Sequence, residues 1–335
     1  MKKALVMGAG GFIGGHLVQR LKDENYFVVA ADLKFPEHRE TSADEFHIGD
    51  LSDRVFTLKL LELHRDVAEI YQLAADMGGA GFIFTGENDL DVMENSAGIN
   101  LALTWVLTRP QFSSTRPKIF YSSSACIYPE GIQSDPLSVD LREENAYPAN
   151  PDSEYGWEKL FSERLFFALE RNYAVPVRVA RFHNVYGPYG TWEGGREKAP
   201  AAICRKVAES DFTDGIVEVW GNGTQTRSFL YIDDCIEAVR RFMSQEEFSG
   251  PVNIGSEEQV SLNDLVLLTS KIAKLPVQIR NVPGPVGVMG RNSNNDLIRE
   301  KLNWDYQFSL EEGVSRTYRW IRSQVELKRD KRTSV

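Results

Sequence analysis

The sequence contains few cysteines and no long apolar run, and these shortages exclude several classes of protein. Its three cysteines, Cys126, Cys204 and Cys235, show neither the spacing of a metal site nor the even number of a disulfide framework. This pattern favours a reducing compartment, so we expect a cytoplasmic protein with no metal site. No signal peptide or stretch of membrane-spanning length is visible, and no membrane partner is expected.

Positive charge is also scarce. The 335 residues include 38 Lys and Arg against 48 Asp and Glu, giving a formal net charge of −10. This excess of acid disfavours a nucleic-acid-binding surface, and an anionic ligand would need a local basic pocket. Hydrophobic residues make up 42% of the chain. At this length they can form the buried core of one large α/β domain or of two joined ones.

A glycine-rich turn follows the first apolar run, residues 3–7, and precedes a helical pattern at residues 16–22. Gly8 would allow a tight turn, Gly11 would let the backbone approach a pyrophosphate, and Gly14 would pack helix against strand. The combination of strand, spaced glycines and helix predicts a dinucleotide-binding site.

Acidic residues follow the next two apolar runs. Asp32 comes 18 residues after Gly14, where a carboxylate can accept a hydrogen bond from a ribose 2′-hydroxyl. A 2′-phosphate would be repelled there, so NAD is expected rather than NADP. Asp50 could bind the adenine amino group, or it could cap the helix that follows it.

Strands and helices alternate along the first half of the chain, which predicts an α/β fold with a doubly wound parallel sheet (Rossmann). Strands are expected at residues 3–7, 26–31, 45–51, 69–73, 118–122, 175–181 and 251–255, and helices at residues 16–22, 52–63, 91–107, 153–172 and 199–206. The second half suggests a smaller, interleaved C-terminal region. We expect an NAD-binding domain at 1–182 and 228–256 and a substrate domain at 183–227 and 257–335. The polar tail from Glu326 is expected to fray.

Tyr155 and Lys159 lie four residues apart on the helix that begins after Asp152 or Ser153. They should therefore share one helix face. An ammonium group beside a phenol favours the phenolate, so the pKa of Tyr155 should fall toward neutrality and suit proton transfer. A tyrosine four residues before a lysine is common on ordinary helix surfaces. This pair indicates a proton-transfer site only in combination with the surrounding motifs.

Two further side chains follow the fifth expected strand. Ser124 and Cys126 are two residues apart, so an extended segment would present both to one side. Cys126 could instead be a small buried hydrophobic residue, which is common for free cysteine. His183, after the sixth strand, is more consistent with a hydrogen-bonded structural residue than with a catalyst.

Arginines in the second half could bind an anion. Arg227 lies in a glycine-bounded turn and Arg291 in a flexible segment. Two such guanidinium groups beside one cleft would suit a diphosphate, although each alone could equally be a surface residue.

Together these residues resemble the extended short-chain dehydrogenases/reductases that act on nucleotide sugars. The chain is most similar, over nearly its whole length, to the GDP-mannose 3,5-epimerase family. Six segments carry the resemblance: residues 74–79 (AADMGG), 123–129 (SSACIYP), 181–184 (RFHN), 194–201 (GGREKAPA), 225–229 (QTRSF) and 290–293 (GRNS).

The resemblance implies tightly bound NAD, a GDP-sugar substrate and epimerisation of GDP-mannose at C3 and C5 through transient oxidation at C4. Tyr155, with Lys159 and Ser124, would serve the C4 hydroxyl. Cys126 and Lys198 would act as acid and base at C3 and C5, and a thiolate near an ammonium group would be favoured by charge pairing.

The resemblance also assigns contact residues. The cofactor would be contacted by Gly8, Gly11, Phe12, Ile13, Gly14, Asp32, Asp50, Tyr155 and Lys159. The sugar nucleotide would be contacted by Gly78, Ser124, Cys126, Asn184, Glu197, Lys198, Ala199, Lys206, Gln225, Arg227 and Arg291. The helices expected at residues 91–107 and 153–172 would pair across a two-fold axis as a four-helix bundle, giving a homodimer.

Two other functions remain open at this stage. A UDP-sugar 4-epimerase would need no cysteine–lysine pair, and a 4,6-dehydratase would show Asp-Glu in place of Cys126-Ile127. A non-catalytic relative that senses NAD or associates with RNA would keep the fold, but loss of Tyr155 or Lys159 would mark it, and both are present.

Overall fold

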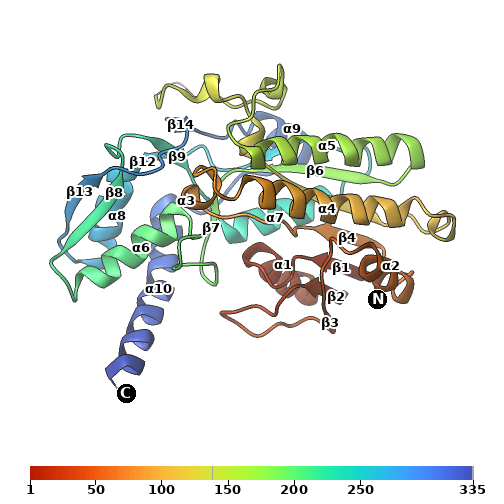
Figure 1. The fold of residues 1–335 in the computed structure, drawn as a ribbon, viewed down its shortest axis with the longest axis horizontal. Coiled ribbons are helices and arrows are strands. Elements are labelled where there is room, and N and C mark those ends of the chain that lie inside the picture. The colour runs from red at the N-terminus through yellow and green to blue at the C-terminus, as the bar shows by residue number, and fades with distance from the viewer. Residues whose placement is uncertain (138, 334–335) are drawn as a thin grey trace.

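The computed structural model describes residues 1–137 and 139–333 and is built around a seven-stranded parallel sheet (Figure 1). The strand order is β11-β6-β5-β4-β1-β2-β3. Their bounds are β1 (Lys3–Met7), β2 (Phe27–Asp32), β3 (Glu45–Ile48), β4 (Glu69–Gln72), β5 (Lys118–Ser124), β6 (Val177–Phe182) and β11 (Val252–Ile254). The predicted doubly wound sheet is confirmed, because the order runs outward from β1 in both directions.

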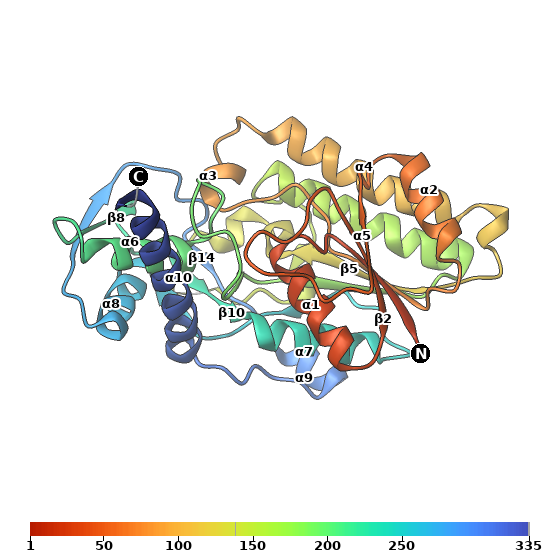
Figure 2. The same cartoon turned by 90° about the horizontal axis from the view of Figure 1, so that it is seen from below.

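Helices cover both faces of this sheet (Figure 2). One layer holds α1 (Phe12–Asp23) and α7 (Ile232–Met243); the other holds α2 (Arg54–Leu63), α4 (Asp89–Leu107) and α5 (Glu154–Tyr173). Alternation along β1 explains the two cores: Ala4 and Val6 pack toward the first layer, and Leu5 and Met7 toward the second. Within residues 1–137 and 139–333, no helix has the length and apolarity needed to cross a membrane.

The second half of the chain adds smaller sheets beside the carboxyl edge of the large one. The three-stranded sheet orders as β12 (Gln259–Ser261), β9 (Thr226–Ser228) and β14 (Gly290–Arg291), while β8 (Ile216–Trp220) pairs with β13 (Gln278–Val282) and β7 (Val185–Tyr186) with β10 (Leu230–Tyr231). The remaining helices are α3 (Ala80–Ile83), α6 (Ala199–Ser210), α8 (Leu262–Ala273), α9 (Asp296–Leu302) and α10 (Leu310–Thr333).

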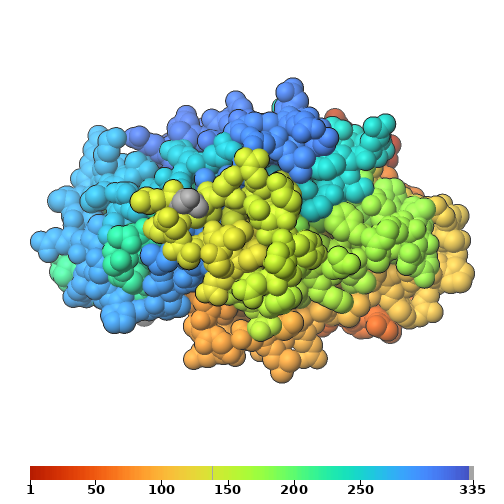
Figure 3. All heavy atoms as spheres, turned by 90° about the horizontal axis from the view of Figure 1, so that it is seen from above, coloured from red at the N-terminus to blue at the C-terminus, as the bar shows by residue number. Residues whose placement is uncertain are grey.

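A segment of short 3₁₀ turns between β5 and α5 contacts the smaller sheets of the second half of the chain. It contains η2 (Ala125–Ile127), η3 (Glu130–Gln133) and η4 (Glu143–Ala146), and a further turn, η1 (Pro110–Phe112), lies in the loop before β5. Residues 125–137 and 139–150 lie against the C-terminal part of the chain (Figure 3). The Pro136 carbonyl, for example, accepts a hydrogen bond of 2.8 Å from the Thr226 hydroxyl.

Two sequence-based expectations about helix ends are wrong. The helix α1 starts at Phe12 rather than at residue 16, because Gly11 already occupies the N-cap position. The expected frayed tail is instead the end of α10, which continues to Thr333. The Arg329 guanidinium lies 3.8 Å from the centre of the Phe212 ring, and Lys328 pairs with Glu193. Contacts with distant segments therefore order a polar tail that has no apolar pattern of its own.

A buried ion pair fastens α5 to β6. The Arg181 guanidinium donates two hydrogen bonds of 2.9 Å to the Glu163 carboxylate, and the two side chains are 2% and 3% exposed. Arg181 also donates to the Tyr128 hydroxyl and to the Glu143 carbonyl, and Ser123 donates to Glu163. Both charges are thus fully hydrogen-bonded, as burial requires.

Replacing one member of this pair should be costly. We expect Glu163→Ala to lower the free energy of unfolding by about 3–5 kcal/mol, because it leaves the Arg181 charge buried without a carboxylate. Glu154→Ala, at an exposed position of the same helix, should cost about 1 kcal/mol or less. Equilibrium urea unfolding of both variants would measure the difference. Equal losses would show that Arg181 does not depend on Glu163.

Candidate active site

The turn between β1 and α1 has the backbone of a phosphate-binding loop. Gly8 has φ +88°, and a Cβ there would lie 2.7 Å from the Ala74 backbone nitrogen, so only glycine fits. Gly11 is the N-cap of α1 and supplies no side-chain cap, which leaves the first N–H groups of the helix open to an anion. A Cβ on Gly14 would lie 2.1 Å from the Gly8 carbonyl oxygen, in agreement with its expected packing role. These features fit a dinucleotide.

The acid at the end of β2 faces this turn. One Asp32 carboxylate oxygen accepts a hydrogen bond of 2.9 Å from the Gly10 N–H, and the half-buried side chain lies at the carboxyl edge of the sheet. Burial raises the pKa of Asp32, while the N–H groups of Gly10 and Lys34 lower it. Phe12 and Ile13 follow in the first turn of α1, which places these predicted cofactor contacts on one loop.

Asp50 lies at the end of the neighbouring strand, as expected, but it does not cap the helix that follows. Its carboxylate accepts hydrogen bonds from the Ser52 N–H and hydroxyl, whereas Asp53 is the N-cap of α2. The capping alternative for Asp50 is therefore wrong, because the helix starts later than the sequence suggested. Its exposed carboxylate stays a candidate for the adenine contact.

The first turn of α5 presents the predicted pair. Ser153 caps the helix by accepting a hydrogen bond of 3.2 Å from the Gly156 N–H. Tyr155 and Lys159 follow on one face, and both are buried. The Lys159 ammonium donates a 3.0 Å hydrogen bond to the Ser122 carbonyl at the end of β5 and lies 5.6 Å from the centre of the Tyr155 ring.

Gly156 lets α5 approach the segment that carries the thiol. A Cβ at this position would lie 2.1 Å from the Cys126 carbonyl oxygen, so any larger residue would push the helix away. Cys126 and Tyr155 consequently share one small buried cluster. The Ser124 hydroxyl, one turn earlier, accepts a 3.2 Å hydrogen bond from the Cys126 N–H and fixes the same segment.

Burial controls the protonation of Tyr155. It raises the pKa of the phenol, Cys126 and Glu158 raise it further, and the Ser124 hydroxyl only partly opposes them. The expectation that Lys159 would lower the pKa of Tyr155 toward neutrality is therefore wrong. The pKa of Lys159 is itself lowered by burial. The site thus favours a neutral phenol. The phenolate can form only when a bound group offsets the free-energy cost of burying its negative charge.

The Cys126 thiol has a partner that the sequence pattern did not reveal. The Arg291 guanidinium lies 3.2 Å from the Cys126 sulfur, 2.8 Å from the Gln133 side-chain oxygen, and forms a close ion pair with Asp152. Cys126 and Arg291 are 165 residues apart in the chain. Asp152 had been considered only as a helix cap, a role that Ser153 fills.

Burial also dominates the two expected acid–base groups. The pKa of Cys126 is raised by burial and by Asp152, and Arg291 only partly offsets these effects. The pKa of Lys198 is lowered, chiefly by burial, although the nearby thiol favours its charged form. The structure therefore contradicts the expected thiolate–ammonium pair: both groups are shifted toward their neutral forms. They do lie close enough to influence each other electrostatically.

The loop that carries Lys198 docks on the glycine-rich segment after β4. The Gly79 N–H donates a 2.9 Å hydrogen bond to the Arg196 carbonyl, beside the predicted contacts Gly78 and Glu197. The Glu197 carboxylate accepts hydrogen bonds from the Gly195 N–H and from Arg205. Lys198 is the N-cap of α6, and Ala199 is its first residue.

The two predicted anion-binding arginines come together. Arg227 and Arg291 are register partners in the parallel pair β9–β14. Arg291 is neutralised by Asp152, whereas Arg227 donates only to the carbonyls of Thr226, Val286 and Val288. Burial and the nearby Arg291 lower the pKa of Arg227 to about 9. Within the described part of the chain, Arg227 forms no ion pair with a carboxylate, which leaves a cation suited to an anionic ligand.

Other predicted contacts surround this arginine. Gln225 is buried, donates to the Trp220 carbonyl, and leaves its side-chain oxygen without a partner among the described residues. Asn184 adopts φ +45° and donates to the Ser228 carbonyl. Lys206 lies farther along α6, where its ammonium donates a 2.6 Å hydrogen bond to the Glu218 carbonyl, and among the described residues it forms no hydrogen bond with the thiol cluster.

His183 has the structural role that was expected. It is completely buried, its Nε2 lies 3.0 Å from the Asn253 side-chain oxygen, and burial lowers its pKa to about 3. The residues missed by sequence reasoning are Asp152, Gln133 and Gly156. Only Gly156 had a local signal, because a glycine inside a helical pattern often marks a close backbone approach.

Comparison with known proteins is consistent with this site. Residues 4–255 match the NAD dependent epimerase/dehydratase family. The GDP-mannose 3,5-epimerase of Arabidopsis thaliana is 44% identical over 335 residues, covering 99% of this chain and 85% of that protein. GDP-mannose 3,5-epimerase 1 of Oryza sativa subsp. indica is 45% identical, covering 96% of this chain and 82% of that protein.

Solved structures share the fold. The UDP-glucose 4-epimerase of Thermotoga maritima superposes with a TM-score of 0.81 at 24% identity, covering 96% of this chain and 99% of that one. The UDP-glucuronic acid 4-epimerase of Bacillus cereus, in complex with UDP-glucuronic acid and NAD, gives a TM-score of 0.79 at 25% identity with the same coverage. By its sequence and fold, the chain belongs to the NAD dependent epimerase/dehydratase family and, within it, to the GDP-mannose 3,5-epimerases.

Proposed function

We propose that the protein epimerises GDP-mannose at C3 and C5, giving GDP-L-galactose and GDP-L-gulose as accessible products. One observation carries this proposal: the Cys126 thiol shares a buried cluster with Tyr155, and Lys198 lies within electrostatic reach of the same thiol. Tyr155, which can exchange a proton with a sugar hydroxyl, thus lies near Cys126 and Lys198, which can exchange protons with carbon. This combination suits epimerisation next to a transient ketone.

NAD, when bound, supplies the transient oxidation of the sugar at C4 and its later reversal. Gly8, Gly11, Gly14 and Asp32 would hold it at the turn after β1. Tyr155 would act in its phenolate form: it would first release its own proton to solvent, then accept the proton of the C4 hydroxyl and return it at the end, with the Lys159 ammonium 5.6 Å from its ring to favour the phenolate. Because the hydroxyl proton is taken and returned within one site, no net proton is consumed.

Cys126 and Lys198 would exchange protons at the carbons next to C4. A ketone at C4 makes the hydrogens at C3 and C5 acidic, since the resulting negative charge delocalises onto oxygen. One group must then remove a proton from one face while the other delivers a proton to the opposite face. In the neutral forms that burial favours, the Cys126 thiol can donate a proton and the Lys198 amine can accept one.

The second part of the chain would hold the GDP moiety. Arg227 keeps its positive charge without a carboxylate partner in the described chain, and would face the diphosphate together with Gln225 and Asn184. Gly78, Glu197, Ala199 and Lys206 would complete the sugar and nucleotide contacts from the loop around Lys198. We accordingly assign residues 1–182 and 228–256 to cofactor binding, and residues 183–227 and 257–335 to substrate binding.

A simple UDP-sugar 4-epimerase is the second candidate, because solved structures of that activity share the fold. Such an enzyme needs to invert only C4 and has no use for proton exchange at C3 or C5. The buried thiol beside Tyr155 therefore favours the first proposal. A cytoplasmic location is also proposed, since all three cysteines are free and buried.

A homodimer is proposed through the outer faces of α4 and α5, which run side by side (Figures 1 and 2). Trp157 and Phe161 are 41% and 48% exposed and lie four residues apart on α5, and Leu101 on α4 is also exposed. Aromatic side chains on a shared face are typical of a subunit interface.

Isotope exchange tests the chemistry. Incubation with GDP-mannose in heavy water should place deuterium at C3 and C5 of the sugar, as located by NMR. Cys126→Ala should reduce this exchange by about 10²–10⁴-fold, which is the usual effect of losing one acid–base group. The same variant should still form NADH transiently on addition of substrate, because Tyr155 remains in place.

Two comparisons make that test specific. Tyr155→Phe should remove both the NADH signal and the exchange, whereas Cys204→Ala, which alters another fully buried free cysteine, should leave both unchanged. Full exchange in Cys126→Ala would contradict the role of the thiol. Inversion at C4 without deuterium at C3 or C5 would instead support the UDP-sugar type of reaction.

The cofactor prediction follows from Asp32. The supernatant of the denatured, freshly purified protein should contain NAD(H), because a cofactor that is regenerated in place does not need to dissociate between turnovers. Identification by mass spectrometry of NADP rather than NAD would contradict the repulsion expected between Asp32 and a 2′-phosphate.

The dimer prediction can be tested by light scattering. The wild-type protein should have twice the mass of one 37.9 kDa chain at micromolar concentration. Phe161→Glu should shift the mass toward the monomer by placing a charge in an apolar interface. Leu267→Glu, at an exposed apolar position on α8, should not. A monomeric wild-type protein would argue against this interface.

A further inference from the structure

A second cluster of polar side chains lies at the far edge of the sheet, outside the proposed active site. Glu45 and His47 are two residues apart on the edge strand β3, so both side chains point to the same face. His64, the C-cap residue of α2, reaches the same place. No step of the proposed reaction uses these three residues.

The ligand atoms of the cluster converge on one point. The two imidazole Nε2 atoms are 3.1 Å apart, and one Glu45 carboxylate oxygen lies 3.5 Å from His47 Nε2 and 3.7 Å from His64 Nε2. A point about 2.1 Å from all three atoms lies just above the plane of this triangle and leaves room for a fourth ligand. That is the distance at which zinc is bound by imidazole nitrogen and by carboxylate oxygen.

The shape of the triangle also matches a particular coordination geometry. Ligands in a tetrahedral zinc site are separated by about 3.3–3.4 Å, and adjacent ligands in an octahedral site by about 2.9 Å, for bonds of this length. The observed separations of 3.1, 3.5 and 3.7 Å average closer to the tetrahedral value. Two imidazoles and one carboxylate are, moreover, a donor set that first-row transition metals accept.

The surroundings favour a cation with one open position. His64 is 3% exposed, whereas His47 is 26% and Glu45 is 40% exposed, so water can reach the point of convergence from one side. The last turn of α2 contains no basic residue, and its carbonyl groups carry partial negative charge. The Lys3 ammonium, which acts electrostatically on His64, is paired with Asp66 at 2.8 Å.

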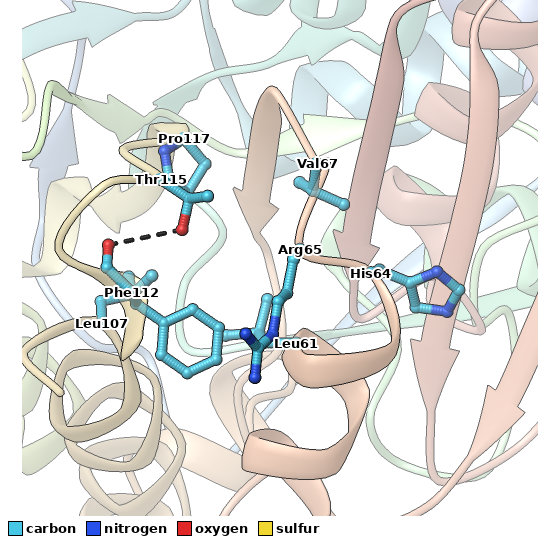
Figure 4. Close-up of a pocket in the computed structure, with 8 residues that line it drawn as sticks. All are labelled: Leu61, His64, Arg65, Val67, Leu107, Phe112, Thr115 and Pro117. Atoms are coloured by element: carbon cyan, nitrogen blue, oxygen red, sulfur yellow. Dashed lines mark hydrogen bonds between the residues drawn. The ribbon is translucent and has the colours of Figure 1, made fainter. Parts of the chain in front are cut away.

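The imidazole ring of His64 points toward the edge strand β3. Other atoms of His64 border an apolar pocket formed with Leu61, Val67 and Phe112. Figure 4 shows that its imidazole points away from the other side chains of that pocket and toward the neighbouring strands. The polar ring therefore contributes to the cluster on β3 and not to the pocket.

We infer that Glu45, His47 and His64 form a binding site for one divalent first-row transition metal ion, such as Zn²⁺, with water as a fourth ligand. The ion would tie the edge strand β3 to the end of α2. The sequence-based expectation of no metal site rests on the cysteines alone, and a separation of 17 positions between the two histidines hides the pattern. The alternative is a simple hydrogen bond between two neutral imidazoles, which would satisfy one pair of nitrogens and leave Glu45 without a role.

Metal titration distinguishes these two cases. The full-length, tag-free protein is stripped with a chelator, dialysed and titrated with Zn²⁺ by calorimetry. One equivalent per chain should bind, and Zn²⁺ should raise the midpoint of thermal unfolding. Co²⁺ in its place should produce the intense visible absorption of a tetrahedral site. Uptake of less than one equivalent, with no thermal shift, would overturn the inference and leave the hydrogen bond.

Variants locate the ion. His47→Gln and Glu45→Gln lie at half-exposed positions of the edge strand, so the fold should persist, which circular dichroism can verify. Each should weaken Zn²⁺ binding at least tenfold and abolish the thermal shift. His38→Gln changes a histidine outside the cluster and should bind as the wild type does. Unchanged binding in His47→Gln and Glu45→Gln would place the metal elsewhere and overturn the inference.

Discussion

The close approach of α5 to the segment after β5 determines the geometry of the proposed active site. Gly156 permits it, because the Cys126 carbonyl occupies the space that a Cβ would need. The buried ion pair of Glu163 and Arg181 holds the same helix about two turns farther on. Tyr155 and Cys126 thereby meet in one cluster although they come from a helix and from a 3₁₀ turn. If the helix moved outward, the phenol and the thiol would no longer face a common ligand.

Burial then sets the chemistry of that cluster. The pKa values of Tyr155 and Cys126 are raised and those of Lys159 and Lys198 are lowered, in each case mainly because burial disfavours the charged form. Burial therefore shifts all four groups toward their neutral forms, while the charge in this cluster is carried by the Asp152–Arg291 ion pair. A neutral thiol or phenol can donate a proton and a neutral amine can accept one, so these groups can exchange protons without first breaking a salt bridge of their own.

Local patterns in the sequence predicted the sheet, its helices and where several candidate site residues lie on them. Glycine spacing, Asp32 after β2, and the four-residue spacing of Tyr155 and Lys159 depend on neighbours along the chain, and the structure places them as expected. What could not be predicted depends on contacts between distant segments. Arg291 reaches Cys126 across 165 residues, the polar end of α10 is ordered by contacts with Phe212 and Glu193 in distant loops, and burial reverses the expected shift in the pKa of Tyr155. Propensity and spacing contain no information on such contacts or on the depth of burial.

The two buried arginines of β9 and β14 differ in whether a carboxylate balances their charge. Arg291 is held by Asp152 and Gln133 and is directed at the Cys126 sulfur, so its charge is already balanced. Arg227, its register partner, bonds only to carbonyls and has a lowered pKa. An incoming diphosphate would gain most from the unbalanced cation, and its negative charge would in turn favour the protonated guanidinium. Arg227 is thus the better candidate for recognising the nucleotide, while Arg291 holds the Cys126 thiol in place.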